Sequence, residues 1–142
     1  MIRRLMIFVW LVCLSVACST AQTNRPFTVA AYNVANWNSI ERDKKPDQPK
    51  PHTEKEAVVE VISAVRPDVL GIEEMGNTND FAELRAMLAA KGLNYPHWEH
   101  VQAHDQNRHI CLLSRFPIVQ RNSRVDYTYN LGEKTFPVGR RS

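Results

Sequence analysis

The spacing of hydrophobic positions changes along the chain and predicts both strands and helices. In residues 27–32, the side chains at 27, 29 and 31 alternate with those at 28, 30 and 32, and this period of two predicts a first strand. A helix is predicted from Thr53, because Thr53 and Glu56 have the spacing of a capping box, in which each side chain satisfies an unpaired backbone N–H of the first turn. The apolar residues of this helix fall on one face, which should face the core: Val58, Val61, Ile62 and Val65.

The next segments continue the alternation of strands and helices. Residues 68–73 follow Pro67 and have the apolar run of a short buried strand. A second helix is predicted to begin near Asp80, with Glu83 in capping-box position, and to end at Gly92. The apolar residues of the second helix also share a face: Phe81, Leu84 and Leu88, with Met87 beside them.

Further strands are predicted in the second half of the chain. Residues 95–101 and 110–113 have strand patterns, and residues 118–138 predict one or two more strands with a turn at 130–132. Residues 41–52 carry three prolines among charges and are expected to form a loop without a core of its own. The order of strand, helix, strand, helix and further strands favours an α/β layered fold in which helices cover a sheet.

The first 21 residues have the pattern of a signal peptide. Two arginines precede an apolar run over residues 5–16, and small residues at 17, 19 and 21 suit a signal peptidase. The run is short for a permanent bilayer span, which favours a cleaved signal peptide. An uncleaved membrane anchor is the alternative. Residues 15–18 also resemble a lipobox, in which Cys18 would carry the lipid. We therefore expect an exported protein, secreted or periplasmic, that meets a membrane only if Cys18 is lipidated.

Charge and cysteine content narrow the interpretation of the remaining chain, residues 22–142. Without the two arginines of the signal segment, 16 basic and 15 acidic residues remain, so bulk charge does not argue for a nucleic-acid partner. A local basic groove would be sought at Arg115, Arg121 and Arg124. Cys111 is the one cysteine of this part, so no internal disulfide can form and a single small domain must rest on its core.

Two polar residues stand at the ends of predicted strands. Asn33 follows the first strand and Glu74 follows the second. In layered α/β proteins, ligand sites gather at the carboxyl ends of strands. A carboxylate there can hold a hard cation such as Mg²⁺, and an amide beside it can orient a phosphate or a second carboxylate. The same residue types are common in turns, so the spacing alone leaves both interpretations open.

Three segments resemble landmarks of the endonuclease/exonuclease/phosphatase family. They are Phe27–Val34, Arg66–Glu74 and Leu112–Ile118, and they occur in the family's order. The resemblance covers about residues 26–142 and implies the N-terminal half of a family domain. The fold it implies is a four-layer α/β sandwich, with two mixed β-sheets packed face to face and helices outside. The third segment, Leu-Ser-Arg-Phe-Pro, is expected to be mainly structural.

The resemblance also implies site residues and a cofactor. Asn33 matches the family's first active-site Asn, and Glu74 matches its metal-binding Glu, with Glu73 where the family usually has Gln. We therefore expect these two residues to serve as catalytic and metal-binding groups for Mg²⁺, with Mn²⁺ or Ca²⁺ as alternatives. The implied chemistry is metal-assisted hydrolysis of a phosphate ester, in which the cation stabilises the charge that develops as water attacks.

Part of the family's site has no counterpart in this sequence. The water-activating Asp and the catalytic His normally come from Gly-Asp-x-Asn and Ser-Asp-His segments, and the sequence contains neither. We expect them beyond Ser142, so that this chain is a fragment and is inactive by itself. The first functional expectation is a secreted nuclease acting on nucleic acid or a small phosphodiester. A phosphatase or sphingomyelinase-like hydrolase, and a non-catalytic remnant or inactive envelope protein, are the alternatives.

Two further groups of residues invite a functional interpretation. A short stretch gathers His100, His104, Asp105 and His109, and the first two have the i, i+4 spacing that binds zinc on a helix. The stretch has the pattern of a strand and a polar loop, which favours solvated side chains. Three aromatic residues could stack on bases, although core or turn packing is the preferred interpretation: Trp37, Tyr95 and Trp98.

Overall fold

The computed structural model describes residues 26–42 and 45–137, so the predicted signal peptide, including Cys18, lies outside the described residues. Within these residues, ten elements follow one another along the chain: β1 (Val29–Asn33), β2 (Ile40–Arg42), β3 (Lys45–Gln48), α1 (His52–Val65), β4 (Val69–Met75), α2 (Thr78–Ala90), β5 (His97–Val101), β6 (His109–Ser114), β7 (Thr128–Leu131) and β8 (Lys134–Pro137). No helix in the described part of the chain is long and apolar enough to cross a membrane.

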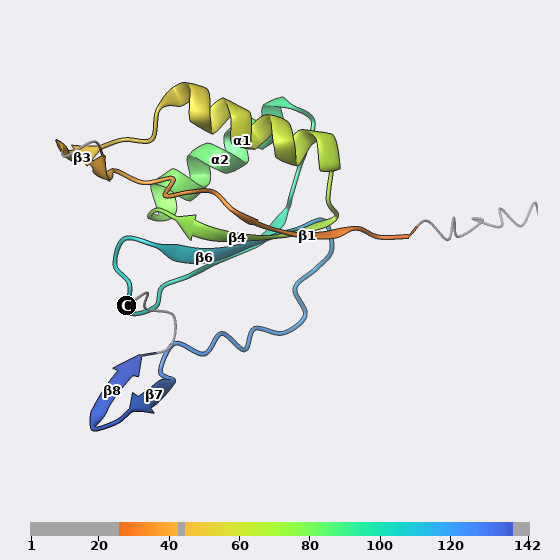
Figure 1. Ribbon diagram of the computed structural model, residues 1–142. Helices are drawn as coiled ribbons and strands as arrows, with labels where there is room; N and C mark the ends of the chain where they lie inside the picture. The colour runs from red at the N-terminus through yellow and green to blue at the C-terminus, as the bar shows by residue number, and fades with distance from the viewer. Residues whose placement is uncertain (1–25, 43–44, 138–142) are drawn as a thin grey trace, which may run out of the picture.

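A mixed four-stranded sheet forms the centre of the structure, with the strand order β1-β4-β6-β5 (Figure 1). Strands β1 and β4 are parallel, whereas β6 is antiparallel to both of its neighbours. A parallel pair needs a long connection between its strands, and α1 lies within that connection. The prediction of an α/β fold is therefore confirmed at the level of a mixed sheet covered by helices.

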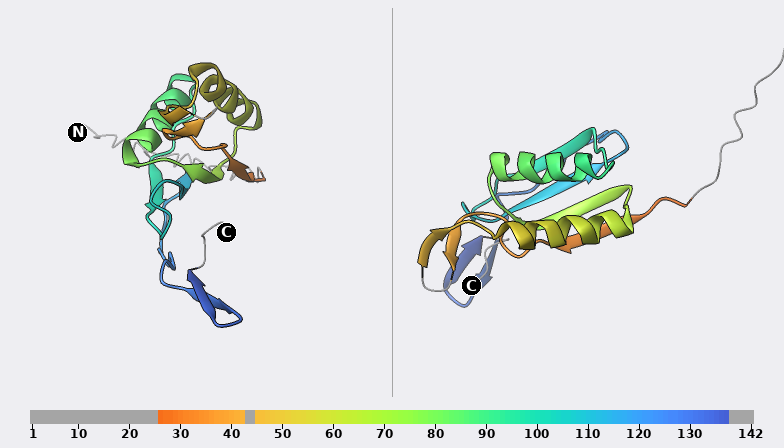
Figure 2. Two further views of the ribbon diagram at one scale, coloured as in Figure 1. Left: turned by 60° about the vertical axis from the view of Figure 1, so that its left-hand side comes forward. Right: turned by 90° about the horizontal axis from the view of Figure 1, so that it is seen from above.

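Both helices cover one face of this sheet, where they lie side by side (Figure 2). The strand positions that face them are apolar and fully buried, as Leu70, Ile72 and Leu113 show. They join the apolar side chains of the helices in one core cluster. The opposite face carries no helix among the described residues, and Val29 and Ile110 are 62% and 58% exposed there.

The first helix begins one residue earlier than predicted and is capped differently. Pro51 is the N-cap residue and provides no side-chain hydrogen bond, so the predicted capping box of Thr53 and Glu56 is wrong. The backbone carbonyl of Pro51 accepts the N–H groups of Glu54 and Lys55 instead. A proline fits here because its fixed φ suits the start of a helix.

The buried face of α1 is also rotated relative to the prediction. Val58 and Ile62 are buried as expected, but Val61 and Val65 are about half exposed. Their places in the core are taken by Val59 and by a polar residue, Lys55. Lys55 can be buried because its ammonium group is paired, as described below.

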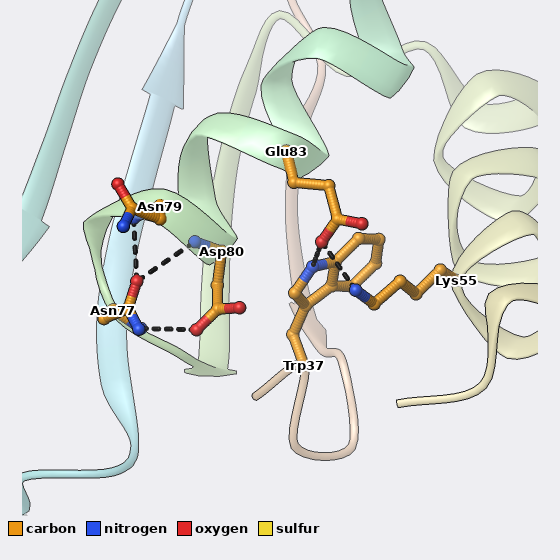
Figure 3. Close-up of polar contacts among 6 residues, drawn as sticks. All are labelled: Trp37, Lys55, Asn77, Asn79, Asp80 and Glu83. Carbon is orange, nitrogen blue, oxygen red and sulfur yellow. Dashed lines mark hydrogen bonds and ion pairs between the residues drawn. The ribbon is translucent and has the colours of Figure 1, made fainter. Parts of the chain in front are cut away.

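The second helix begins at Thr78 with a complete capping box, two residues before the predicted start. The Oδ1 atom of Asn77 accepts the N–H groups of Asn79 (2.8 Å) and Asp80 (3.2 Å). Asp80 returns the interaction by accepting the N–H of Asn77 at 2.9 Å (Figure 3). Asp80 is therefore the third residue of the helix, and the predicted pair of Asp80 with Glu83 is wrong.

Two small hairpins complete the described structure. Strands β2 and β3 pair within the proline-rich stretch, where a loop was expected. Strands β7 and β8 pair as predicted in the last part of the chain, and Figure 1 shows this hairpin on the side of the sheet away from the helices. Both hairpins are separate two-stranded sheets, and the four-stranded sheet is the largest in the described residues.

The capping geometry of α2 yields a stability prediction. Replacement of Asn77 by Ala removes the acceptor of two helix N–H groups and should lower the free energy of unfolding by about 1 kcal/mol. Thr53→Ala is the matched control, because α1 has no side-chain cap bond and should lose less than about 0.5 kcal/mol. Urea denaturation followed by circular dichroism measures both; equal losses would contradict the assignment of Asn77 as the cap.

Candidate functional site

The two predicted site residues lie where β1 and β4 end. This end of the four-stranded sheet is called the edge of the sheet. Asn33 is the last residue of β1, and its partner in the register of the parallel β1–β4 pair is Glu73. Glu74 follows directly in β4, so both predicted site residues stand at the carboxyl ends of adjacent strands. The side chains of Asn33 and Glu74 are each partly buried. The structure thus brings together two residues that are 41 positions apart in the sequence.

The backbone of Glu74 adopts a left-handed conformation, with φ at 59°. The register between β4 and β6 shifts between Ile72 and Met75, so Glu74 lies in an irregularity of the bulge type. A bulge turns a side chain away from the regular alternation of a strand. A non-glycine residue pays about 1–2 kcal/mol for this conformation, and such strain concentrates at functional sites.

The segment after β1 is attached to this irregularity by two backbone hydrogen bonds. Val34 donates its N–H to the carbonyl of Glu73 at 3.0 Å, and Trp37 donates to the carbonyl of Glu74 at 3.1 Å. Between them, Ala35 and Asn36 both have left-handed backbones. The segment after β1 is therefore a tight loop bound to the end of β4.

Trp37 anchors this loop in the core (Figure 3). Its ring is fully buried, and its Nε1–H donates to the Oε2 atom of Glu83 on α2 at 3.0 Å. The same oxygen accepts from Lys55 Nζ at 2.6 Å, and this ammonium lies 5.4 Å from the centre of the Trp37 ring. Burial tends to raise the pKa of the Glu83 carboxyl, but the hydrogen bonds from Lys55 and Trp37 outweigh it and the pKa is lowered.

A buried lysine fixes the other side of the loop. Lys50 is 5% exposed, and its Nζ donates to the carbonyl oxygen of Ala35 at 3.2 Å and to Glu54 at 3.0 Å. This contact supplies a donor to the carbonyl of Ala35, whose backbone is left-handed. Lys50 thus joins the loop after β1 to the start of α1.

The loop between β5 and β6 lies at the same edge of the sheet. Strand β5 runs in the direction of β4, because both are antiparallel to β6, so Val101 ends near the carboxyl end of β4. Arg108 donates from Nε to the Oδ1 of Asn36 at 2.6 Å. Asn38 also donates from its side chain to the carbonyl of Asn107. The two loops therefore form one connected polar surface beside Asn33 and Glu74.

Close packing at Gly76 holds this surface against α2. A Cβ atom at Gly76 would clash with the carboxyl group of Asp80 and would lie 2.8 Å from the Cβ of Asn38. Its carbonyl oxygen is 2.9 Å from the Nε2 of His100. Only glycine fits this position, which lies two residues after Glu74.

The histidine cluster is divided between a buried pair and a loop. His100 on β5 and His109 on β6 have ring centres 4.6 Å apart, and both Nδ1 atoms are buried without a hydrogen-bond partner among the described residues. His104 lies in the loop between the strands, so the helical zinc spacing of His100 and His104 does not occur. Within the described residues no group of three or more His, Cys, Asp or Glu side chains is placed to hold a metal.

The aromatic residues mostly serve packing, as preferred from the sequence. Trp37 and Tyr95 are buried, and the Tyr95 hydroxyl donates to the carbonyl of Pro67 at 2.7 Å. Trp98 is 40% exposed, but its ring packs edge-to-face on Phe81. The guanidinium of Arg85 also lies over the Trp98 ring, 4.6 Å from its centre. Trp37 and Tyr95 are therefore closed to a stacked base.

The three arginines at which a basic groove was sought, Arg115, Arg121 and Arg124, each contact an acidic or aromatic side chain instead. Arg115 pairs with the buried carboxyl of Asp68 at 2.9 Å, at the amino end of β4 and away from Glu74. Arg121 lies 3.5 Å from Glu99, and Arg124 lies over the ring of Tyr127. The Leu-Ser-Arg-Phe-Pro segment acts structurally, as expected of it.

The chain was compared with protein-family models, with curated proteins and with solved structures, and none of the three comparisons found a match. The family resemblance described above therefore stays a prediction.

The strained backbone at Glu74 gives a second stability prediction. Glu74→Gly relieves the left-handed strain in the folded state, but glycine also gives the unfolded chain more freedom. Because the first effect offsets the second, the free energy of unfolding should stay constant or rise by up to about 1 kcal/mol. Glu73→Gly, one residue earlier in regular strand pairing, should lower it by about 0.5–1 kcal/mol. Chemical denaturation of both variants tests this. A loss at Glu74 as large as that at Glu73 would contradict the strain.

The histidine pair predicts a dependence of stability on pH. Burial and the neighbouring His100 lower the pKa of His109 below its ordinary value, despite opposing contributions from Asp105 and nearby carbonyl groups. The unfolded chain then binds a proton at higher pH than the folded chain, so stability is full above about pH 6.5 and falls as the pH drops below it. Denaturation between pH 8 and pH 5 should show this fall, and His109→Gln should flatten it. An unchanged slope in that variant would show that other groups cause the fall.

Proposed function

We propose that the chain carries part of the active site of a magnesium-dependent phosphoester hydrolase, centred on Glu74. The observation that carries this proposal is the strained carboxylate residue at the irregular end of β4, directly beside the end of β1. Strain of this kind persists only where the surroundings impose it, and here two backbone bonds and a buried tryptophan do so. A carboxylate held at the carboxyl end of a central strand is suited to bind a ligand.

The arrangement of the three family landmarks supports the same proposal. They are far apart in the sequence, yet they cover β1, nearly all of β4 and the last residues of β6, and these three strands are neighbours in the sheet. The helix-free face of this sheet exposes apolar residues, as expected if a second sheet packs on it in the complete domain. We therefore retain the four-layer sandwich of the endonuclease/exonuclease/phosphatase family as the proposed fold of that domain.

The donor groups at this edge fit a magnesium ion in their chemistry. Mg²⁺ takes oxygen ligands, uses one or two carboxylates and keeps several waters, so the Glu74 carboxylate together with waters is a suitable partial site. Glu74 would be the ligand, and Mn²⁺ or Ca²⁺ could replace Mg²⁺ there. When bound, such a cation supplies charge stabilisation for a phosphoryl oxygen.

Asn33 is best suited to a hydrogen-bonding role. Its Oδ1 accepts the N–H of Ala35 at 2.9 Å, which fixes the orientation of the side-chain amide. The Nδ2 group is then the part of the side chain most available to a ligand. It can donate to a phosphate oxygen or to a carboxylate, so we propose that Asn33 orients the substrate rather than binding the metal directly.

The substrate proposed first is a nucleic acid or a small phosphodiester, acted on outside the cytoplasm by an exported nuclease. Phosphatase and sphingomyelinase-like activities use the same metal chemistry and remain alternatives. Attachment to a membrane is proposed only through a lipidated Cys18. A screen on DNA, RNA and small phosphodiesters separates these substrates, since cleavage of small esters alone would exclude the nuclease.

A second candidate function is a protein that binds the cation and phosphate without hydrolysis. The sequence lacks the Gly-Asp-x-Asn and Ser-Asp-His segments that would activate water and protonate the product. A hydrolytic activity of the purified 142-residue chain that is lost in Glu74→Ala would rule out this candidate.

Binding of Mn²⁺, a paramagnetic substitute for Mg²⁺, tests the proposed function most simply. Glu74→Gln keeps the size of the side chain but removes its charge, and should weaken Mn²⁺ binding at least tenfold in an electron paramagnetic resonance titration, because the cation loses its only charged ligand from β4. Glu73→Gln is the matched control, because its side chain is exposed one residue away, and it should bind within about twofold of the wild type. Equal binding by all three proteins would contradict a metal site at Glu74.

A further inference from the structure

The position of Arg108 relative to Glu74 is fixed through two routes. In the antiparallel register of β4 and β6, Met75 faces His109, so Arg108 lies toward Gly76, two residues after Glu74, at the end of the strand pair that carries the bulge. Arg108 also donates to Asn36, whose next residue, Trp37, donates to the carbonyl of Glu74. Both routes place the arginine beside the bulge at the edge of the sheet.

The guanidinium of Arg108 is held from two sides. Its Nε is bonded to the Oδ1 of Asn36 at 2.6 Å, and its Nη1 lies 3.6 Å from the Oδ2 of Asp105. Asp105 is itself fixed, because its Oδ1 accepts the N–H groups of Asn107 at 2.9 Å and Arg108 at 3.0 Å. Burial tends to raise the pKa of Asp105, but these hydrogen bonds and the charge of Arg108 outweigh it and lower the pKa. The braced arginine has therefore lost much of its rotational freedom before any ligand binds.

The rest of the guanidinium is open to a ligand. The Arg108 side chain is 39% exposed, and its Nη2 group makes no hydrogen bond to a described residue. Arginine presents planar N–H groups that match the oxygens of a phosphate, and bonds of this type are about twice as strong as neutral ones. Arg115, by contrast, is engaged with Asp68 at the opposite end of β4.

We propose that Arg108 is a substrate-binding residue that receives the anionic oxygens of a phosphate ester beside Glu74. This inference rests on the proposed function and deepens it: the carboxylate of Glu74 attracts the cation, and the guanidinium of Arg108 attracts the phosphate. Asn36 and Asp105 act as positioning residues that aim the guanidinium. The recognised chemistry is a phosphomonoester or phosphodiester group, independent of what it is attached to.

The test uses the full chain and two separate readouts. Binding of phenyl phosphate and of dimethyl phosphate, in the presence of Mg²⁺, is followed by nuclear magnetic resonance titration. Mn²⁺ binding is followed by electron paramagnetic resonance. Arg108→Gln should weaken phosphate-ester binding about tenfold to a hundredfold, because charge-assisted hydrogen bonds are lost, and should leave Mn²⁺ affinity within about twofold. Arg108→Lys, which keeps the charge but not the planar geometry, should give an intermediate loss.

A matched control removes the same charge at the other end of the sheet. Arg66 caps the carboxyl end of α1, just before β4, and Arg66→Gln should bind both probes like the wild type. Circular dichroism melting shows whether each variant is folded. If Arg108→Gln does not fold, Arg108→Lys provides the test in its place.

The outcomes separate this inference from the proposed function. Phosphate-ester affinity that is equal in the wild type and in Arg108→Lys and Arg108→Gln, with Mn²⁺ binding intact, overturns the role of Arg108 and leaves the metal site standing. A wild-type chain that binds no phosphate ester overturns it as well. Phosphate binding that depends on Arg108 in a chain that binds no Mn²⁺ supports the role of Arg108 and overturns the metal site at Glu74.

Discussion

The parallel pairing of β1 with β4 is the constraint on which the proposed site depends. Parallel strands end at the same edge of a sheet, so this pairing places Asn33 beside Glu73 and Glu74 although a helix separates them in the sequence. The helix in the crossover covers the sheet and contributes to the core. The chain after β1 is then bound back onto β4 through the N–H groups of Val34 and Trp37.

The same arrangement explains why the edge is polar while the interior beneath it is apolar. The buried Trp37 ring, with Glu83 and Lys55 paired around it, fixes the loop after β1 from below. Above this anchor, the left-handed turns at Ala35, Asn36 and Glu74 direct side chains away from the regular strand alternation. Strain that would weaken an ordinary strand is supported here by a packed core, which is the usual relation between a rigid scaffold and a functional site.

The sequence predicts the main elements of this fold, because their apolar periodicity reflects the core directly. The sequence does not predict features that depend on local geometry, such as helix caps and the exact buried face of a helix. The cap of α2 is Asn77 rather than Asp80, and Val61 and Val65 are exposed because a paired lysine occupies part of the buried face of α1.

At the site, the two strand-end residues were predicted, but the bulge at Glu74 was not. The supporting residues Lys50, Asn36 and Arg108 were also missed, because each acts through a partner far away in the sequence, and only the charge of Lys50 and Arg108 in otherwise polar loops hinted at a role.

Paramagnetic broadening of backbone amide signals by Mn²⁺ tests the central claim most directly, because it reports where on the molecule a cation binds. With a small fraction of bound Mn²⁺, we expect the signals of Asn33, Val34 and residues 73–76 to disappear first, since they surround the end of β4. Signals at the opposite edge, such as those of Arg66 and Gly92, should persist. Broadening centred on the loop that contains His104, or none at any site, would contradict a metal centre at Glu74.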